Sequence, residues 1–171
     1  MTEKEELELL EYFMKNIRAG FDNLYEGLDD FLDDSDLMDL WYDYDFILAR
    51  EIIKNFQDSD WQWLSQNVKL KSDNWKMKVI YCINEDFGIK GLEFLLSMID
   101  ETDEVFIYVI DSMRFFLEPE FINRVKSTDL VAERVNQLLK TGDPFDKPML
   151  EEFSRNFLVG AKFTLDEIEL E

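Results

Sequence analysis

Residues 1–20 read MTEKEELELLEYFMKNIRAG, and their spacing favours an α-helix. Thr2 can cap the first turn, with Glu5 at the third helical position of a capping box. The apolar side chains form one stripe, about 120° wide at about 100° per residue, that consists of Leu7, Leu10, Phe13, Met14 and Ile17. Gly20 is a natural end for this helix.

A second apolar stripe follows within residues 21–34. It consists of Phe21, Leu24, Tyr25, Leu28, Phe31 and Leu32, and the acidic residues between them fall outside it. If this helix continued beyond Ser35, the apolar residues from Leu37 to Phe46 would scatter around its whole circumference, so we expect it to end there. The first two helices are predicted to form an antiparallel hairpin.

The rest of the chain also favours helices. Only 6 Gly and 3 Pro interrupt the 171 residues, which argues for short connections and against a turn-rich β architecture. Capping residues and apolar spacing predict helices that begin near Asp45, Ser72 or Asp73, Ile89, Asp103, Pro119, Thr128 and Asp146. We expect a connection containing Trp61 and Trp63 after the first of these helices, and Gly88 near the end of the second.

Two segments allow more than one structure. Val105–Ile110 is a continuous apolar run, which predicts either part of a central helix from Asp103 or a buried strand. The tail Lys162–Glu171 fits a strand or a frayed helix. The paired helices between Asp73 and Lys140 recur at about 30 residues, a spacing typical of HEAT-like stacking, although no residue pattern repeats.

These patterns predict an all-α fold, a single domain of stacked helical hairpins. An acidic N-terminal hairpin is expected over residues 1–45, a helical-repeat-like body over 46–158 and a tail over 159–171. Hydrophobic residues make up 46% of the chain, which provides for a core and excludes a disordered acidic tail.

The chain is strongly acidic. Asp and Glu number 39 against 18 Lys and Arg, for a net charge of −21, and residues 1–60 alone carry −13. Because like charges repel, neither nucleic acid nor an anionic membrane is expected as a direct partner. The N-terminus lacks the pattern of a secretory signal, and Val105–Ile110 is far shorter than the roughly 20 residues that span a bilayer, so a cytoplasmic location is expected.

The residue types that most catalytic and metal sites require are absent. The sequence has no His, which removes the commonest general base and metal ligand. Cys82 is the only Cys, and its place beside Val79 and Ile83 on an apolar helix face predicts a buried thiol. The Asp-rich segment lacks the Gly of an EF-hand loop, and no Gly-rich phosphate loop occurs. We predict a protein that is not an enzyme and holds no cofactor or metal.

The segment from Asp29 to Asp45 is the strongest candidate for a binding surface. It contains eight Asp and no Lys or Arg, with Trp41, Tyr42 and Tyr44 among them. Aromatic rings flanked by charge are typical of protein-binding hot spots. The predicted partner-binding residues are Asp29, Asp30, Asp33, Asp34, Asp36, Asp39, Trp41, Asp43, Tyr44 and Asp45. Two alternatives remain: the acidic run is only a solvated helix face, and Trp41 belongs to the core.

Four lysines surround Trp75 later in the chain. Lys69, Lys71, Lys76 and Lys78 resemble a small nucleic-acid patch, but the field of the whole molecule opposes that function. We interpret them as a counter-charged surface that faces the acidic N-terminal hairpin.

The segment from Asn74 to Val125 resembles the α-helical immunity proteins of bacterial contact-dependent growth inhibition, a polymorphic-toxin system. Three stretches carry the resemblance: Trp75–Cys82 (WKMKVIYC), Gly91–Leu96 (GLEFLL) and Val105–Tyr108 (VFIY). Such immunity proteins bind the toxin domain of a cognate effector, often a cationic nuclease, and block its active site or substrate surface. The resemblance transfers no binding residue.

The resemblance and the charge together predict a cytosolic immunity protein that neutralises a basic toxin domain, most simply a nuclease. The first alternative is a nucleic-acid mimic that inhibits DNA-binding or RNA-binding proteins. The second is an acidic secretion chaperone or a helical scaffold.

Overall fold

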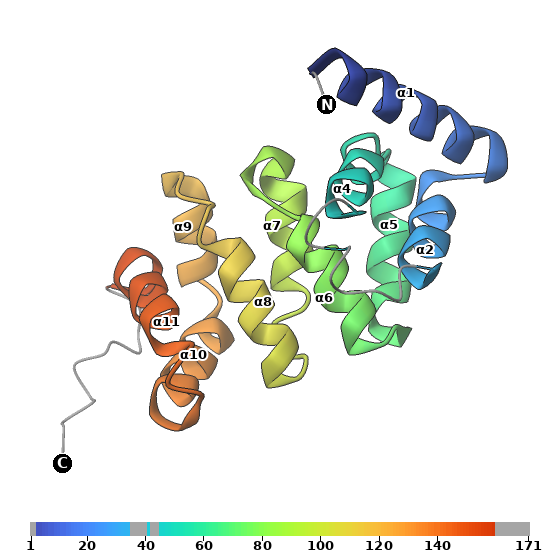
Figure 1. Cartoon of the computed structure of the whole chain (residues 1–171). Helices are drawn as coiled ribbons and strands as arrows, with labels where there is room; N and C mark the ends of the chain where they lie inside the picture. The colour runs from blue at the N-terminus through green and yellow to red at the C-terminus, as the bar shows by residue number, and fades with distance from the viewer. Residues whose placement is uncertain (1–2, 35–40, 42–44, 160–171) are drawn as a thin grey trace. The chain divides into compact units, whose positions relative to one another are not determined.

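The computed structural model describes residues 3–34, 41 and 45–159, and within them every regular element is a helix (Figure 1). The predicted all-α fold is confirmed. Val105–Ile110 lies inside a helix, so the strand alternative for this run is wrong. The predicted cap Thr2 and the tail Lys162–Glu171 lie outside the described residues.

The internal contacts divide the chain into two compact units, residues 1–83 and 84–171. The single domain stays a prediction. None of the described helices is both long enough and apolar enough to cross a membrane.

The first unit is built around α2. Its helices are α1 (Glu3–Gly20), α2 (Leu24–Asp34), α4 (Phe46–Lys54), α5 (Asp58–Asn67), the 3₁₀ turn η2 (Val68–Leu70) and α6 (Asp73–Cys82). α2 packs against α1, α4, α5 and α6. The side chains buried between these helices include Met14, Ile17, Leu28, Leu32, Ile52, Ile53, Leu64 and Val79. The predicted end at Gly20 and the restart around Asp45 are confirmed. The structure describes α2 to Asp34, and residues 35–40, on which the predicted end near Ser35 depends, lie outside the described residues.

Trp61 and Trp63 lie in helix α5, so the prediction that they belong to a connection is wrong. Gln57 and Asp60 form a reciprocal capping box at its start, and the Asp60 carboxylate accepts the backbone N–H of Gln57 at 2.8 Å. Leu64 and Val68 bury the inner face of the segment. Trp61 packs inward on Phe56, whereas Trp63 is half exposed, so the two tryptophans do not belong to one apolar face. The helix therefore lacks the apolar stripe from which the other helices were predicted.

Helix α6 begins as predicted. The Ser72 hydroxyl accepts the backbone N–H of Trp75, an N-cap bond. The helix ends at Cys82, and Gly88, predicted near that end, instead begins the next helix with φ of 54°. That positive φ explains the glycine, because other residues rarely adopt it.

The second unit stacks helices in consecutive pairs. They are η3 (Glu85–Phe87), α7 (Gly88–Leu96), α8 (Asp103–Met113), α9 (Pro119–Lys126), α10 (Asp129–Thr141), α11 (Lys147–Phe153) and the π-helical turn η4 (Ser154–Leu158). α7 packs against α8 and α9, α10 against α9 and α11, and η4 against α9. Its core includes Leu92, Leu95, Phe106, Val109, Ile110, Phe116, Val135, Phe153 and Phe157.

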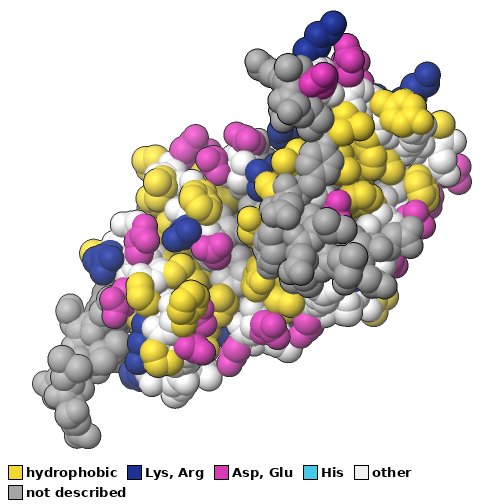
Figure 2. Space-filling view, in the orientation of Figure 1, with side chains coloured by type: hydrophobic (Ala, Val, Ile, Leu, Met, Phe, Trp, Pro, Cys, Tyr) yellow, Lys and Arg dark blue, Asp and Glu magenta, His cyan; other side chains and the backbone are white. Residues whose placement is uncertain are grey.

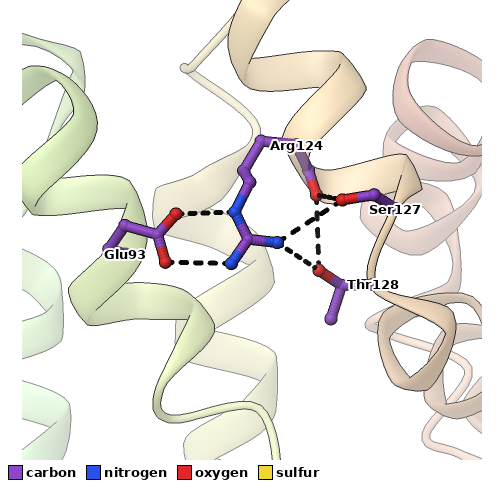
Figure 3. A network of polar contacts seen from close by, with 4 residues as sticks. All are labelled: Glu93, Arg124, Ser127 and Thr128. Atoms are coloured by element: carbon purple, nitrogen blue, oxygen red, sulfur yellow. Dashed lines mark hydrogen bonds and ion pairs between the residues drawn. The ribbon is translucent and has the colours of Figure 1, made fainter.

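Arginine side chains connect these helix pairs through ion pairs with acidic residues 31 positions earlier in the chain. Arg124 of α9 donates two N–H groups to the Glu93 carboxylate of α7, at 2.6 and 3.0 Å, and another to the Thr128 hydroxyl (Figure 3). Arg134 of α10 pairs with Asp103, which is likewise 31 residues earlier. Thr128, predicted as an N-cap, makes no capping bond with its side chain.

Candidate functional site

Acidic side chains line one face of α2. Glu26 is three and four positions from Asp29 and Asp30, and each of these is three or four positions from Asp33, so the four side chains are neighbours on the helix surface. The start of this helix is held by the buried Asp60, whose Oδ1 accepts the backbone N–H of Leu24 at 3.1 Å and that of Tyr25 at 3.2 Å. A carboxylate at this end also complements the helix dipole. The position of the acidic face is thus fixed by a polar anchor in the core.

Two of the predicted counter-charges contact α2. The Lys71 ammonium pairs with Asp29 and lies 3.9 Å from Asp33, and it lies 5.4 Å from the ring centre of Trp75. The buried Lys78 donates to the backbone carbonyl of Leu32 at 3.3 Å. The prediction that these lysines face the acidic hairpin is confirmed for Lys71 and Lys78.

The acidic face also affects a buried phenol. Tyr25 is 6% exposed, and burial together with the nearby Asp29 and Asp33 carboxylates raises its pKa to about 12. The phenol therefore stays neutral at physiological pH and adds no charge to the acidic face of α2.

A cavity of about 330 Å³ opens between α2, α5 and η2. Its lining comes from α2 and from the segment of residues 63–71, and it consists of Tyr25, Glu26, Asp29, Trp63, Asn67, Leu70 and Lys71. Trp63 is 50% exposed and Leu70 is 83% exposed, although both are large apolar side chains. We call Glu26, Asp30, Asp33, Trp63 and Leu70 the α2–α5 surface.

The predicted site residues have different fates. Asp30 and Asp33 are exposed, Asp29 is half buried in its ion pair, and Asp45 is half buried just before α4. The structure describes the backbone of Asp34 but not its side chain. The predicted binding residues outside the described part of the chain are Asp36, Asp39, Asp43 and Tyr44.

Trp41 is a correction. Its side chain is only 1% exposed, and the Lys78 ammonium lies 5.7 Å from its ring centre. A buried ring cannot contact a partner without unfolding its surroundings. Trp41 therefore belongs to the core, and its prediction as a partner-binding residue is wrong.

Trp63 and Leu70 are the apolar residues that the sequence reasoning missed. Trp63, Asn67 and Leu70 follow the i, i+4, i+7 spacing of one helical face. The Gln57–Asp60 capping box is the signal that reveals the helix and therefore this face.

Acidic side chains are spread along the visible face of the molecule, with hydrophobic side chains exposed between them (Figure 2). Among the described residues no group of three or more Cys, Asp or Glu side chains could hold a metal ion. No protein-family model, curated protein or solved structure matches this chain.

Proposed function

We propose that the protein binds a basic protein through the α2–α5 surface, and that it acts in the cytosol as an immunity protein against a basic toxin domain. The observation that supports this proposal best is the exposure of Trp63 and Leu70 beside a row of carboxylates. Exposed aromatic and aliphatic area supplies a hot spot, and charge alone does not.

The net charge of −21 favours fast association with a cationic partner. A cationic nuclease carries a surface built for phosphates, so an acidic protein is attracted to the same surface. Such steering raises association rates toward about 10⁸ M⁻¹s⁻¹ at low salt. Specificity then depends on the apolar contacts, because carboxylates alone accept any basic protein.

Co-expression tests the biological part of the proposal. The proposal predicts that a neighbouring gene encodes the toxin domain, and the C-terminal domain encoded by that gene is expressed in a host with or without this chain, with survival as the readout. We expect the host to survive only with the chain present. Death of the host in both cases, with both proteins soluble, contradicts the immunity function.

Matched charge variants test the surface. Asp30→Asn with Asp33→Asn removes two charges from the α2–α5 surface, and Glu118→Gln with Glu120→Gln removes two exposed charges elsewhere. Association with the toxin domain, measured by stopped flow over a salt series, should slow several-fold more in the first variant. Equal slowing in both indicates attraction by overall charge and argues against this surface.

Affinity capture separates the two alternatives from the proposal. Capture of one tight basic partner supports the immunity function. Capture of several unrelated nucleic-acid-binding proteins favours the nucleic-acid mimic, and stable binding of a non-toxic secreted protein favours the chaperone.

A further inference from the structure

The second unit contains a cavity that the predicted site does not include. It has a volume of about 340 Å³ and lies where the start of α8 meets the loop between α10 and α11. Its apolar lining comes from Ile107, Leu138 and Leu150, and its carboxylates include Glu104, Asp143 and Asp146. Leu138 and Leu150 are buried and Ile107 is half buried, so the apolar side chains form the floor.

Phe145 stands in the same loop, between two of these carboxylates. It is 89% exposed, the most exposed of the large apolar side chains that the structure describes. The Asp143 carboxylate accepts the backbone N–H of Phe145 at 2.8 Å, which fixes the turn. Gly142 brings the loop against α10, because a Cβ there would lie 2.6 Å from the Leu138 carbonyl oxygen. An exposed aromatic side chain thus belongs to the loop whose Asp143 and Asp146 line the cavity.

The carboxylates of the cavity are largely uncompensated. In the described part of the chain, Glu104, Asp143 and Asp146 make no ion pair. Asp103, which also lines the cavity, pairs with Arg134, whose guanidinium lies 4.3 Å from the ring centre of Phe106. Arg134 is therefore an internal example of a guanidinium held by a carboxylate and a phenyl ring in this region.

We propose that this cavity receives a lysine or arginine side chain from an extended segment of the basic partner, with Phe145 packing against that segment. The inference rests on the proposed function, which makes the partner a basic protein. Lysine and arginine combine an aliphatic stem with a cationic head. The stem matches the floor of Ile107, Leu138 and Leu150, and the head matches the three carboxylates.

The probe is a short fluorescein-labelled peptide, rich in lysine and arginine, titrated into the full-length protein. Asp143→Asn with Asp146→Asn removes two carboxylates from the cavity, and the amide oxygen introduced at position 143 can still accept the Phe145 N–H. Glu118→Gln with Glu120→Gln removes the same charge elsewhere in the same unit. We expect about a tenfold loss of peptide affinity in the cavity variant and less than about a twofold loss in the control.

Methyl NMR locates the contact. The peptide should shift the methyl signals of Ile107, Leu138 and Leu150, and Phe145→Ser should weaken binding while the melting temperature stays close to that of the unmodified protein. Unshifted methyl signals, or equal losses in the two charge variants, overturn the inference. This test uses no toxin, so the inference can fail while co-expression still protects the host, and the two failures are distinguishable.

Discussion

The two units carry nearly the same charge, but their basic side chains make different kinds of contact. Residues 1–83 hold 19 acidic and 9 basic side chains, and residues 84–171 hold 20 and 9. In the first unit, lysines lie against the acidic helix: Lys71 pairs with Asp29, and Lys78 reaches the Leu32 carbonyl. In the second unit, arginines join one helix pair to the next, as Arg124 and Arg134 do.

The difference shows that acidic composition does not locate a binding surface. Carboxylates that pair with a lysine or arginine contribute to the fold, as Asp29 does with Lys71 and Glu93 with Arg124. The surfaces that we propose contain carboxylates beside exposed apolar side chains, namely Trp63 and Leu70 in one unit and Phe145 in the other. Exposed apolar area next to acidic charge is the more selective criterion.

The largest difference in stability is expected between variants of the buried and of the exposed tryptophan of the first unit. Trp41→Ala should lower the free energy of unfolding by about 4 kcal/mol, because it empties a packed core position. Trp63→Ala should cost less than about 1 kcal/mol, because half of that side chain is already in water. Urea denaturation measures both, and equal losses contradict the assignment of Trp41 to the core.

A smaller difference should separate the arginine and lysine contacts. Arg134 donates to the carbonyls of Ile99 and Glu101, both at 2.6 Å, so Arg134→Met should cost about 2 kcal/mol. Lys71→Met should cost about 1 kcal/mol or less, because its ion pair with Asp29 is partly exposed to water. Thermal melts of the two variants give the comparison, and a greater loss for Lys71→Met reverses it.

The smallest effect concerns alkaline pH and belongs to the first unit. Burial raises the pKa of the Cys82 thiol from 9.0 to about 12, and burial with Asp29 and Asp33 raises that of Tyr25 from 10.0 to about 12. Folding therefore favours the protonated forms: their stabilisation is complete below pH 9 and declines as the pH rises toward 12. Unfolding free energies measured between about pH 8 and about pH 11 should fall, and less steeply in Tyr25→Phe. An identical slope in that variant excludes the Tyr25 contribution.

Local signals predicted much of the fold. The stop at Gly20, the Ser72 cap and the helix from Pro119 each follow from one or two residues, and the structure contains all three. The Val105–Ile110 run was ambiguous because a short apolar run has no readable period, and only packing within its unit decides for α8.

The candidate site was harder to predict from the sequence. The acidic residues of α2 were found, because charge is visible in composition. Trp41 and Trp63 lie in similar polar surroundings in the sequence, and only tertiary packing makes one 1% and the other 50% exposed. The cavity in the second unit was missed because one part of its lining comes from α8 and the other from residues 138–150, about thirty residues later, and only tertiary packing brings the two together.

The most direct test of the central claim is the dissociation rate of the toxin domain from two variants with matched exposure. Trp63→Ala removes the half-exposed ring of the α2–α5 surface, and Ile89→Ala removes an apolar side chain that is 52% exposed in α7. We predict that dissociation accelerates about tenfold or more for Trp63→Ala and stays unchanged for Ile89→Ala. Unchanged dissociation from a folded Trp63→Ala protein contradicts binding through the α2–α5 surface.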